Sequence, residues 1–345
     1  MSGGVDSAVA AALLAEEGYR VFGITCDFHI ADSNAENSSD DARAVCDVLG
    51  IPHVHVDCRE QFATRIVDAV VRDCRMGLTP SPCVSCNRLV KFPVLFEAAL
   101  DLGCNYIATG HYASIHMVTE GMRCIFKGRD NAKDQSYMLA YVTRDILAKL
   151  VLPLGGMTKC EVRAYAEKLH LPVAHKQDSQ DICFAPHGYR ALLASCGMSD
   201  APGDFVDASG AVLGSHTGFS DYTIGQRKGI GIAAPEPLYV LEKQPAQNRI
   251  LVGTKSEAVI TGVIVRDVVW QAFADEPESV DAEAKLRYRS SQVRCHVESL
   301  GGGRYRVELE NEQEITAPGQ FAVFYNGECV LGAGVIESVI RSVEA

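Results

Sequence analysis

The sequence predicts an α/β protein with a Rossmann-like N-terminal domain, a small central domain and a C-terminal antiparallel β-barrel. Strand-like and helix-like segments alternate through the first half, which is typical of a parallel sheet wrapped by helices. From residue 259 onward, short runs alternate polar and apolar residues, as barrel strands do. With 345 residues the chain exceeds the size of a single hydrophobic core. We therefore expect domains at residues 1–185, 186–258 and 259–345.

Apolar periodicity and helix-ending glycines predict the individual elements. Helices are expected at residues 7–17, 40–50, 61–74, 86–103 and 159–170, and strands at 20–26, 53–58 and 106–110. In the barrel, "AKLRYRS" reads as a strand whose alternation places Lys285, Arg287 and Arg289 on one face. A polar outward face is ordinary for such a strand. Together with Tyr288 and Arg294, however, it also suits contacts with nucleic-acid phosphates.

Composition excludes several classes of protein. The chain has no run of eighteen apolar residues and no signal-peptide pattern at its start, so we expect a cytoplasmic protein without a membrane segment. Its 13 cysteines lie in an α/β-like sequence, and most of them should be reduced core residues. A net charge of −12 argues against nucleic-acid binding by the whole surface but leaves room for a local basic face.

The chain opens on a glycine loop, "MSGGVDSAVA", directly before a helix. Glycines let a phosphate approach the backbone, and the N–H groups and dipole at the helix start favour its negative charge. A plain turn is the alternative. Because such a loop normally follows a strand, we also expect a short apolar strand upstream of Met1, so that either the true start lies further upstream or this chain is truncated. Intact-mass measurement of the natively expressed protein would decide this point.

A second motif is the C-x-x-C of "TPSPCVSCNRLVKF", formed by Cys83 and Cys86. Taken alone, it fits a zinc site, a redox pair, an iron–sulfur ligand set or a nucleophile. Local spacing does not choose among these four.

Seven strings together resemble the tRNA-uridine 2-sulfurtransferases of the MnmA type, a branch of the PP-loop ATP pyrophosphatases (adenine nucleotide alpha hydrolase-like proteins). They run in family order along the whole chain: "MSGGVDSAVA", "CNRLVKF", "YIATGHYA", "KDQSYML", "DSQDICF", "TIGQRKGIGI" and "APGQFAVFYNGE". The resemblance implies a reaction at the wobble uridine, position 34, of tRNA. ATP with Mg²⁺ adenylates the C2 oxygen of this uridine, and sulfur then replaces that oxygen to give 2-thiouridine. The implied partners are tRNAs of the Lys, Glu and Gln types and a sulfur donor, either a cysteine desulfurase, a sulfur-relay protein or sulfide.

The resemblance also assigns roles to residues. Cys183 matches the cysteine that carries a persulfide, and Cys86 matches the one that attacks it and is left in a Cys86–Cys183 disulfide. The expected ATP-binding residues are Met1, Ser2, Gly3, Gly4, Val5, Asp6, Ser7, Ala8, Val9, Cys26 and Gly110. The expected tRNA contacts are Ser81, Pro82, Cys83, His111, Lys133, Asp134, Gln135, Arg287, Tyr288 and Gln320. For residues 133–135, the alternative to a tRNA contact is a solvated turn without a function.

The sequence departs from the family at Cys83, where the best-known members carry an aspartate with an acid/base role. A thiol supplies no carboxylate at neutral pH, so the proton-transfer role is in doubt. Three thiols, Cys83, Cys86 and Cys183, are then candidates for holding a 4Fe-4S cluster with one open iron, which could carry sulfide. Zinc is less favoured because no fourth ligand is evident. The persulfide route and the cluster route both stay open.

Two rival functions remain. Amide-forming PP-loop ligases share the glycine loop but need neither the paired cysteines nor the basic barrel strand. A non-catalytic RNA-binding module would keep its role after loss of Asp6 or Cys183.

Overall fold

The N-terminal domain wraps helices around short parallel strands. The computed structural model describes residues 1–28, 35–178, 182–185, 188–197 and 201–342. Its first strands and helices are α1 (Val5–Glu16), β1 (Gly23–Asp27), α2 (Ala35–Leu49), β2 (His53–Asp57), α3 (Arg59–Phe62), the π-helix η1 (Ala63–Val67) and α4 (Asp68–Arg75). They are followed by α5 (Pro82–Cys86), the π-helix η2 (Asn87–Lys91), α6 (Phe92–Asp101), β3 (Ile107–Ala108) and β6 (Leu150–Val151). Strand β1 pairs in parallel with β2, and β3 pairs in parallel with β6.

Four helices and a hairpin complete this domain. They are the hairpin strands β4 (Ala113–Thr119) and β5 (Met122–Lys127) and the helices α7 (Ser136–Leu139), α8 (Arg144–Leu147), α9 (Lys159–Lys168) and α10 (Gly188–Ser195). Helix α9 begins with a capping box in which Thr158 and Glu161 satisfy each other's backbone N–H groups. That cap fixes where the helix starts and therefore where Lys159, its first residue, points.

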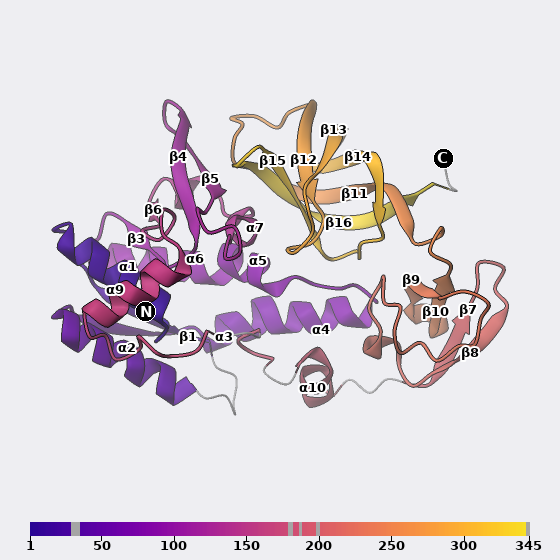
Figure 1. Cartoon of the computed structure of the whole chain (residues 1–345), viewed down its shortest axis with the longest axis horizontal. Helices are drawn as coiled ribbons and strands as arrows, with labels where there is room; N and C mark the ends of the chain where they lie inside the picture. The colour runs from indigo at the N-terminus through magenta and orange to yellow at the C-terminus, as the bar shows by residue number, and fades with distance from the viewer. Residues whose placement is uncertain (29–34, 179–181, 186–187, 198–200, 343–345) are drawn as a thin grey trace.

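The central part is a small mixed sheet in the order β8-β7-β10-β9. Its elements are β7 (Gly203–Val206), β8 (Val212–His216), the 3-10 helix η3 (Phe219–Asp221), β9 (Tyr239–Gln244), the 3-10 helix η4 (Pro245–Gln247) and β10 (Arg249–Gly253). Its apolar side chains, such as Phe205 and Ile250, belong to one hydrophobic cluster with the barrel residues Trp270 and Phe324. The central sheet is therefore packed onto the barrel (Figure 1).

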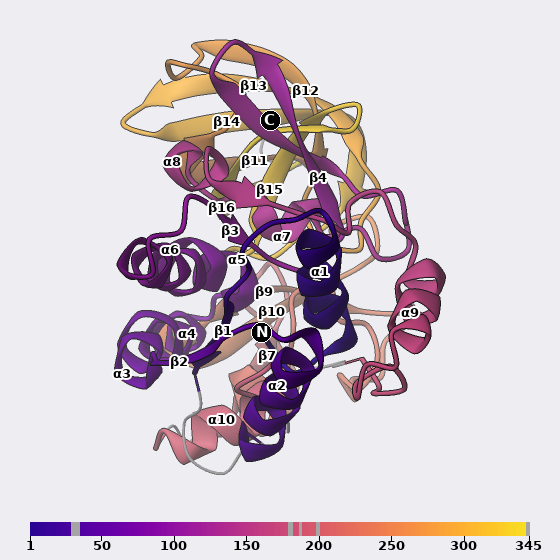
Figure 2. The ribbon, with the colours of Figure 1, turned by 90° about the vertical axis from the view of Figure 1, so that its left-hand side faces the viewer.

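The C-terminal strands close into an antiparallel barrel, as the sequence predicts. They are β11 (Val259–Trp270), β12 (Ser279–Lys285), β13 (Val293–Gly301), β14 (Arg304–Glu314), β15 (Phe321–Asn326) and β16 (Cys329–Arg341). The order β11-β14-β13-β12-β15-β16 is closed by pairing of β11 with β16. Hairpin β4–β5 extends this sheet, because Phe126 pairs with Cys329. The N-terminal domain thus lends two strands to the C-terminal sheet (Figures 1 and 2), which the sequence analysis does not foresee.

One strand prediction is wrong. Strand β12 ends at Lys285, and the chain then turns, so Arg287 and Arg289 do not share a strand face with it. The turn is built by Ser290: its Oγ accepts from the Arg287 backbone N–H at 3.2 Å, and its own N–H donates to the Arg287 carbonyl at 3.1 Å. A serine that bonds the backbone in this way competes with the ladder of a sheet.

Among the described residues, no helix combines the length and the apolar character that crossing a membrane requires.

Candidate active site

A cavity of 1960 Å³ lies in the N-terminal domain at its border with the barrel. It joins the glycine loop to the cysteine motif, which are far apart in sequence. The predicted site residues that line it are Met1, Ser2, Gly3, Gly4, Val5, Asp6, Ser7, Cys26, Pro82, Cys83, Cys86, Gly110, His111, Lys133, Asp134, Gln135, Cys183 and Tyr288. Ala8 and Val9 lie on the side of helix α1 that is fully buried in the apolar core, and they do not line the cavity.

The glycine loop is shaped as an anion-binding turn at the start of α1. Gly3 has φ +66°, and a Cβ there would lie 2.2 Å from the carbonyl oxygen of Ser38, so this position requires glycine. Ser7 Oγ donates to the Gly4 carbonyl at 3.0 Å and accepts from the Ser2 N–H at 3.2 Å. The loop therefore presents backbone N–H groups at the positive end of a helix, where phosphate is favoured.

Gly110 packs against the back of the same loop. A Cβ on Gly110 would lie 2.6 Å from the Asp6 carbonyl carbon, closer than side chains and backbone approach one another. The predicted nucleotide contact at Gly110 thus coincides with a position where the loop tolerates no side chain.

We expect Gly110→Ala to lower ATP consumption at least about 100-fold, since a shift of about 1 Å at a reacting group costs that much. The matched control is Gly156→Ala, because a Cβ there meets nothing within 4 Å. Pyrophosphate release by the two purified variants gives the comparison. Equal activity of the two variants would show that the loop tolerates displacement.

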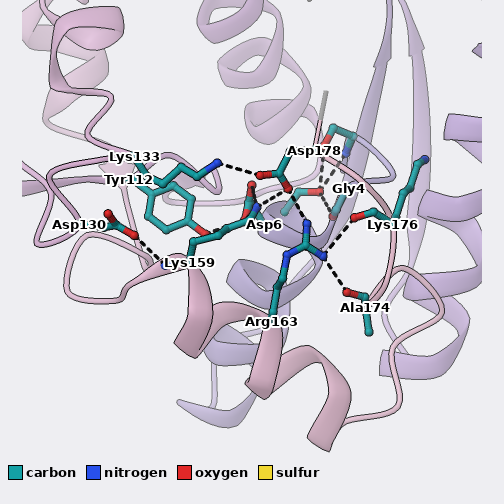
Figure 3. A network of polar contacts seen from close by, with 12 residues as sticks. Gly4, Asp6, Tyr112, Asp130, Lys133, Lys159, Arg163, Ala174, Lys176 and Asp178 are labelled. Atoms are coloured by element: carbon teal, nitrogen blue, oxygen red, sulfur yellow. Dashed lines mark hydrogen bonds and ion pairs between the residues drawn. The ribbon is translucent and has the colours of Figure 1, made fainter. Parts of the chain in front are cut away.

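A network of charges anchors the loop to helix α9 (Figure 3). Lys159 is 9% exposed, and its ammonium donates to both carboxylate oxygens of Asp6 at 2.7 and 2.9 Å and lies 2.8 Å from Asp178 Oδ1. The Tyr112 hydroxyl donates to Asp6 Oδ1 at 2.7 Å. The Lys159 ammonium thereby balances the negative charge of the Asp6 carboxylate, which reduces the repulsion between Asp6 and a phosphate in the adjacent loop.

Asp178 is shared by three cations. Lys133 and Arg163 lie 2.9 and 2.8 Å from its carboxylate oxygens, in addition to Lys159. Burial alone would raise the pKa of Asp178, but hydrogen bonds from Lys159 and Lys133 outweigh it and lower the pKa to about 2. Asp178 is therefore ionised at neutral pH, and it connects the loop network to Lys133, a predicted tRNA contact.

The three candidate cysteines border the cavity, but they differ in exposure. Cys86 ends helix α5 and is 8% exposed, whereas Cys83 and Cys183 are exposed. Burial raises the pKa of the Cys86 thiol to about 11, against the opposing effect of the Lys91 ammonium and with small contributions from Cys183 and Cys83. Burial also raises the pKa values of Cys83 and Cys183. All three are thus mainly thiols at neutral pH, not the depressed-pKa thiolates usual for sulfur carriers.

The three thiols do not fit a metal or iron–sulfur centre. Within the described ranges, no group of three or more His, Cys, Asp or Glu side chains is placed to hold a metal ion. A 4Fe-4S cluster needs thiolates gathered around one point, and this part of the chain does not supply that arrangement.

Lys91 is a site residue that the sequence analysis misses. It closes the π-helix η2, which follows Cys86 directly, and it lines the cavity. Its backbone N–H bonds Cys86, and its charge acts on the thiols of Cys83, Cys86 and Cys183. The motif "CNRLVKF" contains this lysine five residues after Cys86. A π-turn brings residues at that spacing together. No local sequence pattern predicts a π-turn, so the position of Lys91 beside Cys86 could not be predicted.

Lys159, Asp178 and Tyr112 are also missed. Tyr112 and Asp178 lie inside quoted motifs, "YIATGHYA" and "DSQDICF", which is the signal that could have found them. Lys159 has no such signal, because it is simply the first residue of a capped helix.

Several predicted tRNA contacts are held by the protein itself. The ring of His111, which is partly buried, shares a hydrogen bond between its Nδ1 and Thr109 Oγ1 at 2.8 Å. Desolvation of the ring together with the Lys91 charge lowers its pKa to about 3, so the ring is neutral at pH 7. Asp134 accepts from the N–H groups of Gly128 and Ser136 at 3.0 and 3.1 Å. Gln135 Oε1 accepts from the Tyr112 N–H at 2.9 Å. Residues 133–135 are therefore a braced segment and not a free solvated turn.

The barrel contacts brace the same region. Tyr288 donates to the Asp134 carbonyl at 3.1 Å, Gln320 Nε2 donates to the Thr79 carbonyl at 2.8 Å, and Arg287 donates to the Ile315 carbonyl. Tyr288 lines the cavity, whereas Arg287, Gln320 and Ser81 are not among its lining residues. Pro82 is buried at the start of α5.

Fold and cavity together define the class: a HUP-type α/β protein with a phosphate loop, joined to two β domains. Three family models match the chain: "tRNA methyl transferase HUP domain" over residues 1–187, "tRNA methyl transferase PRC-barrel domain" over 193–254 and "Aminomethyltransferase beta-barrel domain" over 260–336.

The full-length relatives are more specific. Proteins named tRNA-specific 2-thiouridylase MnmA are 42% identical to this chain: that of Carboxydothermus hydrogenoformans over 98% of this chain and 96% of its own length, and that of Geobacter metallireducens over 99% and 96%. The Synechococcus relative, also 42% identical, covers 100% of this chain and 98% of its own length. The chain belongs to the MnmA family of tRNA-specific 2-thiouridylases, which are sulfur-transferring enzymes.

A solved structure described as the U34-tRNA thiolase NcsA from Methanococcus maripaludis with its 4Fe-4S cluster is 22% identical and aligns over 56% of this chain and 62% of its own, with a TM-score of 0.36. That likeness is too low to transfer its cluster to this chain.

Proposed function

We propose that the protein replaces the C2 oxygen of the wobble uridine of tRNA, position 34, by sulfur at the expense of ATP. The observation that supports this most is the cavity, which brings the phosphate loop, Cys86 and Cys183 to one space. A uracil carbonyl is a poor electrophile, so its oxygen must first become a good leaving group. Transfer of AMP from ATP to O2 provides one and releases pyrophosphate. The tRNA substrate implies work in the cytoplasm.

Sulfur then arrives through the two cysteines. A cysteine desulfurase or a relay protein that carries a persulfide transfers its outer sulfur to the Cys183 thiolate and leaves as a thiol, so that Cys183 becomes a persulfide. Free sulfide, as the alternative donor, would enter only at the later step in which HS⁻ attacks C2. The Cys86 thiolate attacks the inner sulfur, so that HS⁻ leaves and a Cys86–Cys183 disulfide forms. HS⁻ attacks C2 and expels AMP, and an external thiol reduces the disulfide. Because Cys86 is 8% exposed and Cys183 is exposed, loading at Cys183 suits their positions.

Lys91 supplies the positive charge that this step needs. Cys86 must ionise although burial raises its pKa, and HS⁻ is a second anion that forms beside it. An ammonium near both sulfurs favours the charged forms. Among the described residues, Lys91 has no carboxylate in an ion pair with it, in contrast to Lys159 and Lys176. Cys83, in place of the family's aspartate, supplies no carboxylate here.

The pH dependence of Cys86 alkylation tests Lys91. With a pKa of about 11, the thiolate fraction and hence the rate with iodoacetamide should rise about tenfold per pH unit between pH 7 and 10. Lys91→Met removes a charge that lowers this pKa, so the profile should move to higher pH, and Lys91→Arg should restore it. Peptide-resolved mass spectrometry measures the rate at Cys86. An identical profile for the methionine variant would remove Lys91 from the proposal.

The salt dependence of tRNA binding tests the Lys133 contact. Lys133 is 41% exposed at its side chain and shares Asp178, so a tRNA phosphate would compete with that carboxylate. Lys133→Gln should reduce the slope of log K against log salt by about 1. Filter binding at several salt concentrations gives the slope, and Lys255→Gln on the exposed central part serves as control. An unchanged slope would place Lys133 outside the tRNA interface.

One experiment tests the function itself. The enzyme is incubated with tRNA, ATP with Mg²⁺ and a sulfide source, and the tRNA nucleosides are then analysed by mass spectrometry. We expect 2-thiouridine from the intact chain. Pyrophosphate release triggered by an amino acid or ammonia, and not by tRNA, would instead identify an amide-forming ligase. Iron retained after anaerobic reconstitution, with activity that depends on it, would replace the persulfide route by the cluster route.

A further inference from the structure

The segment between α4 and α5, residues 76–81, is a place where all three parts of the protein meet. It runs below the barrel towards the central sheet (Figure 1). On the side of the central sheet, a Cβ on Gly77 would lie 2.9 Å from Cγ of Pro245 in η4. On the side of the barrel, a Cβ on Gly319 would lie 3.1 Å from the backbone nitrogen of Thr79. Both β domains therefore contact this segment just before the chain enters α5.

Two hydrogen bonds clamp Thr79 to the barrel. The Thr79 N–H donates to the Pro318 carbonyl at 2.8 Å, and Gln320 Nε2 donates to the Thr79 carbonyl at 2.8 Å. The Gln320 backbone is itself fixed, because its carbonyl accepts from the N–H of Ile336 in β16 at 2.8 Å. Both backbone polar groups of Thr79 thus find their partners in the barrel, which sets the position of this residue.

The chain from Thr79 to the cysteine helix is stiff. Pro80 and Pro82 have a φ angle that is fixed by their rings, and each proline also restricts the residue before it. Pro82 is the first residue of α5, and Cys83 follows it directly. Thr79 and Cys83 are therefore at most about 14 Å apart along the chain. A displacement of Thr79 is passed on to α5, because the intervening residues have little freedom to absorb it.

The same helix ends at Cys86, whose thiol is 8% exposed at the wall of the cavity. A reaction at such a thiol depends on how precisely it is placed. Gln320 is not one of the described residues that line the cavity. Its influence on Cys86 therefore passes through Thr79 and α5.

We propose that Gln320 is a positioning residue for sulfur transfer, which holds Thr79 and thereby sets where α5 places Cys86. The barrel and the cysteine helix are then one mechanical unit, although Gln320 and Thr79 are 241 residues apart in sequence. This inference deepens the proposed function and rests on it, since the role of Cys86 comes from there. The tRNA contact that the sequence analysis expects at Gln320 is the alternative that the experiment separates.

Gln320→Met tests the clamp, because methionine has a similar length but no donor for the Thr79 carbonyl. In the free enzyme, alkylation of Cys86 by iodoacetamide should become about fivefold faster, as expected when one hydrogen bond is lost from the closed state of a buried group. The kcat for 2-thiouridine formation should fall about tenfold, since a shift of about 1 Å at a reacting group costs about 100-fold. The KM for tRNA and the release of pyrophosphate should stay within about twofold, because neither depends on Cys86.

Two further variants complete this comparison. Gln320→Lys restores a donor of similar reach and should return the alkylation rate of Cys86 to that of the unchanged protein. Gln313→Met makes the same chemical change elsewhere in the barrel, where the side chain bonds only the carbonyls of its neighbours Asn311 and Glu312. It should leave the alkylation rate unchanged. Peptide-resolved mass spectrometry measures this rate in every variant.

A backbone variant displaces the segment without touching the Gln320 side chain. Gly319 has φ +92°, and a Cβ there would lie 3.1 Å from Cβ of Leu78 and from the Thr79 backbone. Gly327 has φ +61°, but a Cβ there would meet nothing within 4 Å. Gly319→Ala and Gly327→Ala therefore share the backbone strain, and only the first pushes on residues 78 and 79. We expect faster Cys86 alkylation in Gly319→Ala alone, with thermal unfolding as the check that both variants fold.

The proposal is overturned if Cys86 alkylation is unchanged in both Gln320→Met and Gly319→Ala, because α5 would then keep its place without the clamp. Weaker tRNA binding by Gln320→Met with unchanged alkylation would identify Gln320 as a tRNA contact alone. The alkylation experiment contains neither tRNA nor ATP. Its result is therefore distinguishable from a failure of the protein to form 2-thiouridine.

Discussion

Replacement of Cys183 by serine is expected to lower 2-thiouridine formation by at least about 1,000-fold, while tRNA-dependent pyrophosphate release continues. A serine hydroxyl cannot carry a persulfide, so no sulfur reaches the activated uridine, whereas the phosphate loop that uses ATP is unchanged. Cys86→Ser should lose as much, because the persulfide then has no internal thiol to attack it. Two such losses are not additive when the residues act as one unit, so the double variant should be no worse than either single variant.

Separate assays distinguish the two half-reactions. Nucleoside mass spectrometry measures sulfur transfer, and a pyrophosphate assay measures activation. Cys160→Ser is the matched control, since Cys160 is exposed on helix α9 and has no place in the proposed reaction. If Cys183→Ser makes 2-thiouridine at the normal rate from a persulfide donor, Cys183 is not the sulfur carrier. If pyrophosphate release is lost as well, the cysteine is needed for activation.

Asp6→Asn is expected to destabilise the fold and to stop ATP use. The substitution leaves the buried Lys159 ammonium without the carboxylate that accepts two of its hydrogen bonds, at 2.7 and 2.9 Å. Breaking one partner of a buried ion pair costs about 3 kcal/mol. Asp178 remains 2.8 Å from Lys159 and limits the loss. The midpoint of urea unfolding should therefore fall, and the loop should lose its anchor on α9.

A second substitution shows whether charge or shape is responsible. Asp6→Asn with Lys159→Met removes both charges, so most of the stability should return, but not the ATP use, because the loop geometry depends on the pair. The control Glu161→Gln alters an exposed capping carboxylate of the same helix, 45% exposed at its side chain, and should cost only about 1 kcal/mol. Full activity of the double variant would show that the Asp6–Lys159 pair serves folding alone.

The sequence predicts the class of fold and the chemistry-bearing motifs for local reasons. Strand and helix alternation predicts the N-terminal domain, the short alternating runs predict the barrel, and "SGGVDS" places a phosphate loop at the start of α1. Each single strand, helix or loop in these patterns is encoded by a short run of consecutive residues. The roles assigned to Cys86 and Cys183 stay predictions, although the structure brings both to one cavity.

Other features depend on contacts between distant segments and are not visible in any window of sequence. The run around Arg287 alternates like a strand, but Ser290 bonds the backbone there and turns it. Hairpin β4–β5 joins the barrel sheet through antiparallel pairing of Phe126 in β5 with Cys329 in β16. The extra cysteine Cys83 suggests a cluster, but within the described residues the thiols do not gather as metal ligands.

By itself, the sequence determined the class of fold and the places of the glycine loop and of the cysteine motif along the chain, since loops, caps and periodicity act over a few residues. Only the tertiary structure decided their chemical state. Burial raises the pKa of the Cys86 thiol, and the π-helix that follows Cys86 brings the Lys91 charge near the same thiol. The negative charge of Asp6 is balanced by an ion pair with Lys159, 153 residues away in sequence. Desolvation and Coulomb interactions depend on distance in space and not on distance in sequence, so these properties appear only when the chain is folded.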